Sequence, residues 1–227
     1  MTLIRSLAFA FLFYALTTGI VLVGLPVALF SRRGISHVAR AWGRMYLVLA
    51  RAIVGVRINV EGTLPDGPVL VAAKHESAYE TLALLALLEE PIIVLKRELA
   101  AIPLFGTLIR RHGIIPVDRA ASAAALRSML HAADHAKVQR RVVLIFPEGT
   151  RVPHGQAPKL QAGFAGIYAR LAMPVVPVAT NAGIVWPRGL IKHSGIVTMR
   201  FGDPIPATLP RKEIEVAVHA AINVLND

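Results

Sequence analysis

The stretch KHESAYET, residues 74–81, holds a histidine and a carboxylate at a spacing that suits acid–base chemistry. His75 follows the apolar run 69–73, and Glu80 lies five residues later, where an apolar stretch predicts a helix. A neutral imidazole takes up a proton near pH 7, and a carboxylate on its far nitrogen fixes the tautomer and stabilises the imidazolium. The pair predicts a general base that has no nucleophile of its own.

The same residues also fit a capping box, with Ser77 before the helix and Glu80 three positions on. The spacing alone does not decide between a base and a cap. Both are compatible, because a carboxylate at that position points back towards the helix start and His75. Ser77 is not expected to be a nucleophile, since no G-x-S-x-G turn surrounds it, and Tyr79 stands where a zinc-binding H-E-x-x-H motif needs histidine.

Two further stretches end predicted strands, where ligands bind in open α/β sheets. Residues 113–119 read GIIPVDR and residues 146–151 read FPEGTR. Arg119 and Arg151 can each be an incidental surface or ion-pair residue, but two guanidinium groups at neighbouring strand ends would suit an oxygen-rich dianion. The apolar run 175–179 fits either an edge strand of the core, the favoured interpretation, or the wall of an acyl-chain groove.

Short apolar runs alternate with helical stretches after Gly62 and predict an α/β domain over residues 57–227, with a largely parallel or mixed central sheet flanked by helices. The predicted strands are 57–61, 69–73, 92–95, 114–117, 142–146, 175–178 and 197–201. The predicted helices are 78–88, 97–111, 122–138, 163–171 and 211–225.

Residues 1–56 predict a membrane-embedded two-helix element. The 24 residues 7–30 carry no charge and are long enough to cross a bilayer. Residues 37–56 are amphipathic, and this helix fits either the headgroup layer or the domain core. Arginines follow the apolar segment, so the positive-inside bias places the main domain in the cytoplasm. A full span and a hairpin in one leaflet remain equally open.

Composition supports a membrane protein with an anionic partner. The 227 residues have a formal net charge of +11, 55% hydrophobic residues and a mean hydropathy of +0.56. An anionic membrane is favoured over nucleic acid, because aromatic residues make up only 6% and no nucleic-acid module is recognisable. Cysteine is absent, which excludes disulfides and thiolate chemistry.

The ordered set of His75-x4-Glu80, GIIPVDR, FPEGTR and the run 175–179 resembles the four motifs of the glycerolipid acyltransferase family, best known for 1-acyl-glycerol-3-phosphate acyltransferases. The resemblance implies that His75 is the base and that Glu80 orients it. It also implies a set of residues that bind the substrate phosphate: Arg119, Glu148, Gly149, Thr150 and Arg151.

This sequence departs from the family pattern at two places. The usual acid of the first motif is aspartate, whereas this chain has Glu80, one methylene longer, so the geometry of the pair needs testing. Many members carry a lysine shortly before the glycine at position 163, where this chain has Gln161; Lys159 is the candidate substitute.

The resemblance implies a membrane-bound O-acyltransferase that moves an acyl group from acyl-CoA or acyl-acyl carrier protein to the sn-2 hydroxyl of 1-acyl-sn-glycerol-3-phosphate. No cofactor or metal is expected beyond the acyl thioester co-substrate. The implied location is a bacterial-type inner membrane, with the catalytic domain on the cytoplasmic face. Two alternatives stay open: another acceptor such as lyso-ornithine lipid, and a catalytically silent lipid-binding protein.

Overall fold

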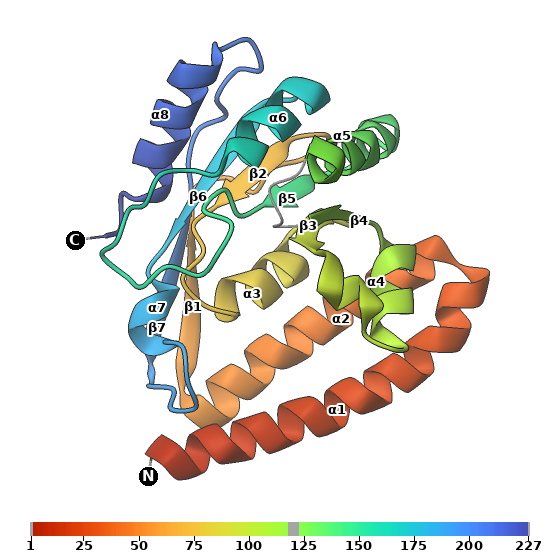
Figure 1. The fold of residues 1–227 in the computed structure, drawn as a ribbon. Helices are drawn as coiled ribbons and strands as arrows, with labels where there is room; N and C mark the ends of the chain where they lie inside the picture. The colour runs from red at the N-terminus through yellow and green to blue at the C-terminus, as the bar shows by residue number, and fades with distance from the viewer. Residues whose placement is uncertain (1, 118–122, 227) are drawn as a thin grey trace.

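The computed structural model describes residues 2–117 and 123–226 and places a central sheet between two layers of helices (Figure 1). The strands are β1 (Val56–Glu61), β2 (Leu70–Ala73), β3 (Ile92–Lys96), β4 (Ile114–Val117), β5 (Val143–Ile145), β6 (Val175–Thr180) and β7 (Gly195–Phe201). Their order in the sheet is β1-β7-β6-β2-β5-β3-β4.

The sheet is mixed. The run from β6 to β4 is parallel throughout, whereas β7 pairs antiparallel with β6 and parallel with β1. The prediction of a largely parallel or mixed sheet is therefore confirmed. Because β2, β5 and β6 are neighbouring parallel strands, their carboxyl ends meet at one edge of the sheet.

The predicted helices are present except for one break, but the helix predicted over 37–56 begins five residues earlier and ends in a π-helical turn, and the short helix Ala182–Val185 was not predicted. They are α1 (Thr2–Phe30), α2 (Arg32–Leu49), η1 (Ala50–Val54), α3 (Tyr79–Leu87), η2 (Arg97–Ala101), α4 (Phe105–His112), α5 (Ala123–Val138), α6 (Ala162–Leu171), α7 (Ala182–Val185) and α8 (Arg211–Ile222). The single helix predicted over 97–111 is wrong: a 3-10 turn and α4 replace it. Pro103 offers no amide hydrogen, and Leu104 takes a φ of 62° that helix geometry forbids.

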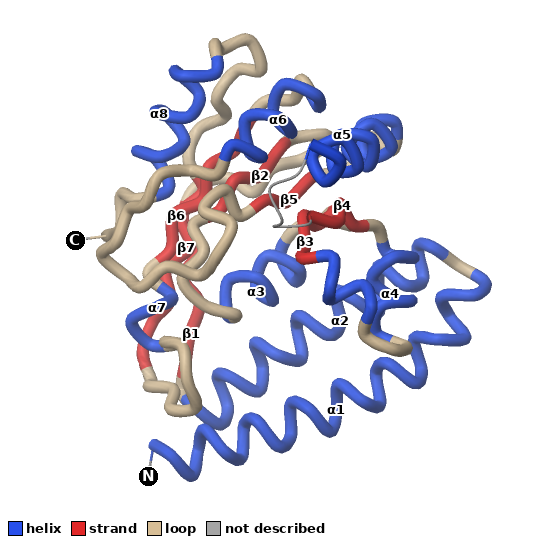
Figure 2. The backbone as a smooth tube through the Cα atoms, in the orientation of Figure 1, coloured by secondary structure: helices blue, strands red, loops and turns tan. Residues whose placement is uncertain are grey.

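Alternation along β2 divides the core between the two faces of the sheet. Leu70 and Ala72 pack with α5, α6 and α8, and Val71 and Ala73 pack with the layer that contains α2 and α3. Figure 2 shows α5, α6 and α8 on one side of the strands and α1, α2 and α3 on the other. The edge-strand position favoured for 175–179 is wrong, because β6 lies between β2 and β7 and all six of its residues are buried.

Helix α1 packs on the domain through a narrow stripe. Its buried residues are Ser6, Phe9, Gly24 and Ala28. Phe9 forms edge contacts with Tyr46 of α2 and with Trp186, with ring centroids 5.4 and 4.9 Å apart. The other sides of α1 are apolar and exposed. The helix is long and apolar enough to cross a membrane, with a mean hydropathy of 2.1 in a window of which 11% is buried.

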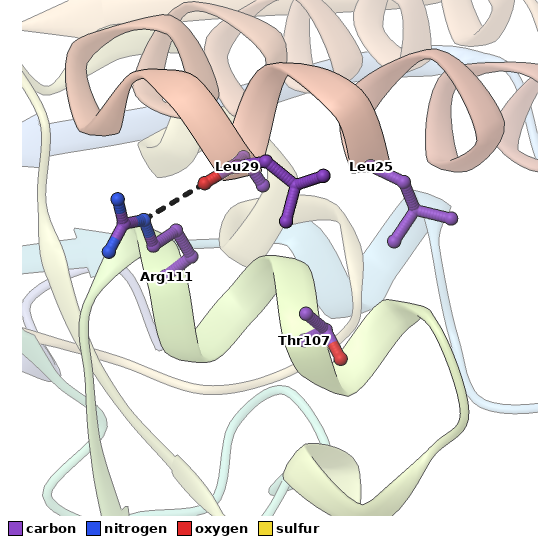
Figure 3. A pocket seen from close by; sticks show the side chains of 5 residues that line it. Leu25, Leu29, Thr107 and Arg111 are labelled. Carbon is purple, nitrogen blue, oxygen red and sulfur yellow. Dashed lines mark hydrogen bonds between the residues drawn. The ribbon is translucent and has the colours of Figure 1, made fainter.

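A cavity of about 320 Å3 lies between the carboxyl half of α1 and α4 (Figure 3). Leu25, Leu29 and Thr107 line it, and the Arg111 Nε donates a hydrogen bond of 2.9 Å to the Ala28 carbonyl across its end. None of the predicted site residues that the structure describes lines this cavity. The cavity therefore lies at the interface between α1 and α4.

Candidate active site

The site lies where the segments after β2, β5 and β6 come together. The His75 carbonyl accepts a hydrogen bond of 2.7 Å from the Val152 amide, which joins the segment after β2 to the one after β5. The Glu76 Oε2 accepts one of 2.7 Å from the Gly183 amide of α7, which follows β6. The backbone around His75 is therefore held by the two neighbouring strand ends.

The structure pairs His75 with Glu80. The His75 Nδ1 lies 2.8 Å from the Glu80 Oε1, with the His75 side chain 15% exposed and the Glu80 side chain fully buried. A carboxylate accepts at Nδ1, so this nitrogen carries the proton and the neutral ring keeps its lone pair at Nε2. Glu80 reaches His75 in spite of its extra methylene.

Glu80 also holds the start of α3. Its Oε1 accepts from the Ser77 amide at 2.7 Å, and its Oε2 accepts from the Ser77 hydroxyl at 2.6 Å. The Ser77 Oγ in turn accepts from the Tyr79 amide at 2.9 Å. One carboxylate therefore orients the imidazole and satisfies the helix start at once. The Ser77 hydroxyl is buried and engaged, which leaves it unsuited to attack a substrate.

The FPEGTR segment packs beside the His75 ring. Phe146 stacks on the imidazole with ring centroids 4.1 Å apart and planes 26° apart. Gly149 has a φ of 69°, and a Cβ there would lie 2.8 Å from the Gln161 Cγ. Only glycine fits this turn without strain. Gln161 thus packs against the loop, while Lys159 is exposed.

Glu148 is buried and both its oxygens are engaged by protein groups. Its Oε1 accepts from the Lys74 ammonium at 2.8 Å, and its Oε2 accepts from the His75 amide at 2.9 Å. A direct contact of Glu148 with a substrate phosphate stays a prediction. In this geometry Glu148 supports the backbone of His75.

Thr150 and Arg151 are exposed at the mouth of the site. Arg188, from the segment after α7, donates to the Thr150 Oγ1 at 3.4 Å and to the Arg151 carbonyl. Burial of the Lys192 ammonium lowers its pKa, and the positive charge of Arg151 lowers it further. Among the described residues, three cations thus gather here without a carboxylate ion pair.

Arg119, predicted to contact the phosphate, lies outside the described residues. The strands that carry the two predicted arginines are not neighbours, because β3 lies between β4 and β5. That part of the prediction is wrong. The prediction assumed that strands whose motifs follow one another in the sequence are also adjacent in the sheet.

A second pair of histidine and buried glutamate lies next to the first and was not predicted. The His154 Nδ1 lies 2.9 Å from the Glu76 Oε1, and burial raises the Glu76 pKa while its hydrogen bonds to Gly183 and His154 oppose the rise. Lys74 and Arg188 were also missed. Lys74 precedes His75 directly, and that adjacency was the available signal; nothing in the sequence brings Arg188 to Thr150. Within residues 2–117 and 123–226 no cluster of three or more acidic or histidine side chains is arranged to hold a metal.

Comparison with known proteins gives the family. A family model described as "Acyltransferase" matches residues 57–181. A 1-acyl-sn-glycerol-3-phosphate acyltransferase of Pseudomonas aeruginosa is 35% identical over 173 residues, which cover 75% of this chain and 67% of that protein. The mouse 1-acyl-sn-glycerol-3-phosphate acyltransferase alpha is 26% identical over 165 residues, covering 71% of this chain and 57% of the mouse protein.

A solved structure shares the fold. The crystal structure of the 1-acyl-sn-glycerophosphate acyltransferase PlsC from Thermotoga maritima matches with a TM-score of 0.80 at 21% identity, covering 98% of this chain and 95% of that one. At 21% identity this match is evidence for the fold alone. The family match spans more than half of the chain and includes both His75 and FPEGTR, so the protein belongs to the acyltransferase family and is an enzyme of the O-acyltransferase class.

Proposed function

We propose that the protein transfers a fatty acyl group from an acyl thioester to the sn-2 hydroxyl of 1-acyl-sn-glycerol-3-phosphate, giving phosphatidic acid. The observation that carries this proposal is the His75–Glu80 pair at 2.8 Å, whose geometry leaves the His75 Nε2 available as a base. The relatives named for this reaction support the choice of acceptor.

The proposed mechanism is a direct transfer. The His75 Nε2 removes the proton from the acceptor hydroxyl as its oxygen attacks the thioester carbonyl, and the buried Glu80 stabilises the imidazolium. Collapse of the tetrahedral intermediate breaks the C–S bond, and the imidazolium returns its proton to the thiolate. No acyl-enzyme is formed, in keeping with a Ser77 hydroxyl that already donates to Glu80.

We assign the acceptor phosphate to the cations at the mouth of the site. Arg151 is exposed there, and Arg188 fixes the carbonyl of the same residue. Guanidinium groups give phosphate oxygens paired, charge-assisted hydrogen bonds. Arg119 remains part of this assignment by resemblance alone. The assay below compares the two candidate acyl donors, acyl-CoA and acyl-acyl carrier protein.

We further propose that the protein is bound to a membrane through α1, with the catalytic domain on the cytoplasmic face of a bacterial-type inner membrane. Several large apolar side chains of α1 face outward, among them Ile4 at 71%, Phe11 at 73% and Phe30 at 87% exposure. Such a surface on a helix that already buries its inner stripe is suited to lipid.

The test offers purified protein in mixed micelles both lysophosphatidic acid and lyso-ornithine lipid, each with acyl-CoA and with acyl-acyl carrier protein. We expect transfer to lysophosphatidic acid and a fall in kcat of about 10²- to 10⁴-fold in His75→Ala. The matched control is His154→Ala, which also takes an imidazole from a buried glutamate but lies outside the proposed reacting pair.

Three results would count against the proposal. Near wild-type transfer in His75→Ala would exclude His75 as the general base. Faster transfer to lyso-ornithine lipid than to lysophosphatidic acid would show that the proposed acceptor is wrong. No transfer to either acceptor from either donor by the wild-type protein would favour a silent lipid-binding role.

A further inference from the structure

Lys74, the residue before the proposed base, has a completely buried ammonium group. Its three N–H groups have three acceptors: the Glu148 Oε1 at 2.8 Å, the Gln156 carbonyl at 2.5 Å and the Asn223 Oδ1 at 2.6 Å. An ammonium has three donors, so none is left for a substrate. The role of Lys74 must therefore be exerted through these protein partners.

The alternation of β2 explains why Lys74 reaches these partners. Side chains along a strand point to opposite faces, so Lys74 extends to the face that carries α6 and α8 and His75 extends to the face that carries α3. The Lys74 amide continues the strand pairing, with a hydrogen bond of 2.8 Å to the Val178 carbonyl. A displacement of Lys74 is thus passed to His75 through one peptide bond.

Glu148 gives a second route to the same residue. Its Oε1 accepts from Lys74 and its Oε2 accepts from the His75 amide at 2.9 Å. The adjacent part of the same segment binds the His75 carbonyl through Val152 at 2.7 Å. Both backbone groups of His75 are therefore held by the segment after β5, and Lys74 holds that segment in turn.

Asn223, which follows the last residue of α8, completes the network. Its Nδ2 donates to the His219 carbonyl at 2.6 Å, which turns the Oδ1 towards Lys74. Asn226 reinforces this orientation by donating to the same Oδ1 at 2.9 Å. The carboxyl end of α8 thereby contacts the residue beside the proposed base, although 149 positions separate Lys74 from Asn223.

We infer that Asn223 is a positioning residue of the active site, which acts on His75 through Lys74 and Glu148. The inference rests on the proposed role of His75 as general base. Productive proton transfer requires the imidazole to sit within hydrogen-bond reach of the acceptor hydroxyl, so a small displacement of the His75 backbone lowers turnover more than binding.

The test compares Asn223→Ala with His219→Ala. The His219 Nε2 ties α8 to the same loop through the Ala157 carbonyl at 3.1 Å but is not one of the three hydrogen-bond partners of the Lys74 ammonium. We expect Asn223→Ala to lower kcat about tenfold, with KM for both substrates changed less than about twofold. His219→Ala should keep wild-type kcat. Asn223→Asp retains an acceptor for Lys74 but loses the donor to the His219 carbonyl, so it should restore part of the lost rate.

A second readout does not depend on turnover. The 15N chemical shifts of the His75 ring, assigned with His75→Gln, report its tautomer and its hydrogen bond to Glu80. We expect these shifts to move in Asn223→Ala, to move less in Asn223→Asp and to stay in place in His219→Ala. If Asn223→Ala proves too unstable for assay, Asn223→Gln shifts the acceptor by one methylene and should give the same changes in part.

The inference is overturned if Asn223→Ala keeps wild-type kcat and His75 shifts while its Tm falls, since the contact would then serve stability only. An equal loss of kcat in His219→Ala would overturn it as well. A wild-type protein that acylates no lysolipid would refute the proposed function instead, and the ring shifts would still show whether Asn223 acts on His75.

Discussion

Replacing Glu80 by glutamine separates the two tasks of this carboxylate. Glutamine keeps the length and one acceptor oxygen, which can still receive the Ser77 amide and the His75 Nδ1–H. Its NH2 group would then face the Ser77 Oγ, which can accept from it, while the Ser77 O–H loses its acceptor. The start of α3 and the histidine tautomer therefore survive, and the negative charge is lost.

The cost to catalysis follows from the geometry of the pair. Unit charges about 4 Å apart in an effective dielectric of about 20 attract by about 4 kcal/mol, which sets a ceiling for the stabilisation of the imidazolium. A neutral hydrogen bond retained by glutamine recovers about 1 kcal/mol of this. We expect a net loss of about 2–3 kcal/mol in the transition state, or roughly 30- to 150-fold in kcat.

Initial rates with lysophosphatidic acid, measured together with thermal unfolding, decide the outcome. The expected Glu80→Gln protein has a Tm within a few degrees of wild type and a strongly reduced kcat. Glu80→Ala serves as the contrast, because it removes the acceptors of both Ser77 and His75 and should lower Tm as well as kcat. A Glu80→Gln protein with normal kcat and a lowered Tm would refute the orienting role and leave only a helix cap.

Further variants probe three other parts of the molecule. Arg188→Ala should raise the KM for lysophosphatidic acid about fivefold at constant kcat, and an unchanged KM would remove Arg188 from the phosphate site. Gly149→Ala should lower the free energy of unfolding by about 1–2 kcal/mol, because alanine is strained at a φ of 69°. Adding Gln161→Ala should remove the close contact between the new Cβ and the Gln161 side chain but should leave the backbone strain. Burial and Arg141 lower the pKa of His112 to about 4, so below pH 6.5 the unfolded chain binds a proton that the fold excludes, and stability falls as pH drops towards 4. His112→Gln should flatten the pH profile of unfolding in that window by up to about 3 kcal/mol, and an unchanged profile would contradict the shift.

Much of the sheet could be read from the sequence, because its strands are short apolar runs closed by glycine, proline or charge. The strands lie within two residues of their predicted bounds, and Ile114–Val117 agrees at both ends. The order of the strands could not be read in this way. The local sequence pattern does not show which strands pair. The position of β3 between β4 and β5, which carry the two arginine motifs, was for this reason not predicted.

The site was predicted in part. The proximity of His75 and Glu80 follows from a local turn, so five residues of sequence carry enough information to predict it. The contacts of Lys74 with Glu148 and Asn223 join segments 74 and 149 positions apart, and no local signal marks them. The break at Pro103 has a local signal, because proline cannot donate a helix hydrogen bond, and the single helix predicted over 97–111 does not take it into account. The helix start at Arg32 depends on a cap by Ser31, whose Oγ accepts from the Gly34 amide at 2.9 Å.

The inner stripe of α1 fixes how this helix is rotated about its own axis. Phe9 packs between Tyr46 and Trp186, and the Ser6 Oγ accepts from the Lys192 amide at 2.9 Å. A Cβ at Gly24 would lie 3.2 Å from the Leu108 Cδ1 and 3.4 Å from the Val38 Cγ1, so α1 approaches the domain closely there. If the outer sides of α1 lie in lipid, the height of His75 above the bilayer midplane is set by rigid packing rather than by a hinge. A thinner or more curved bilayer would then tilt the whole enzyme, and the reach of its base to a lipid hydroxyl would change with the physical state of the membrane.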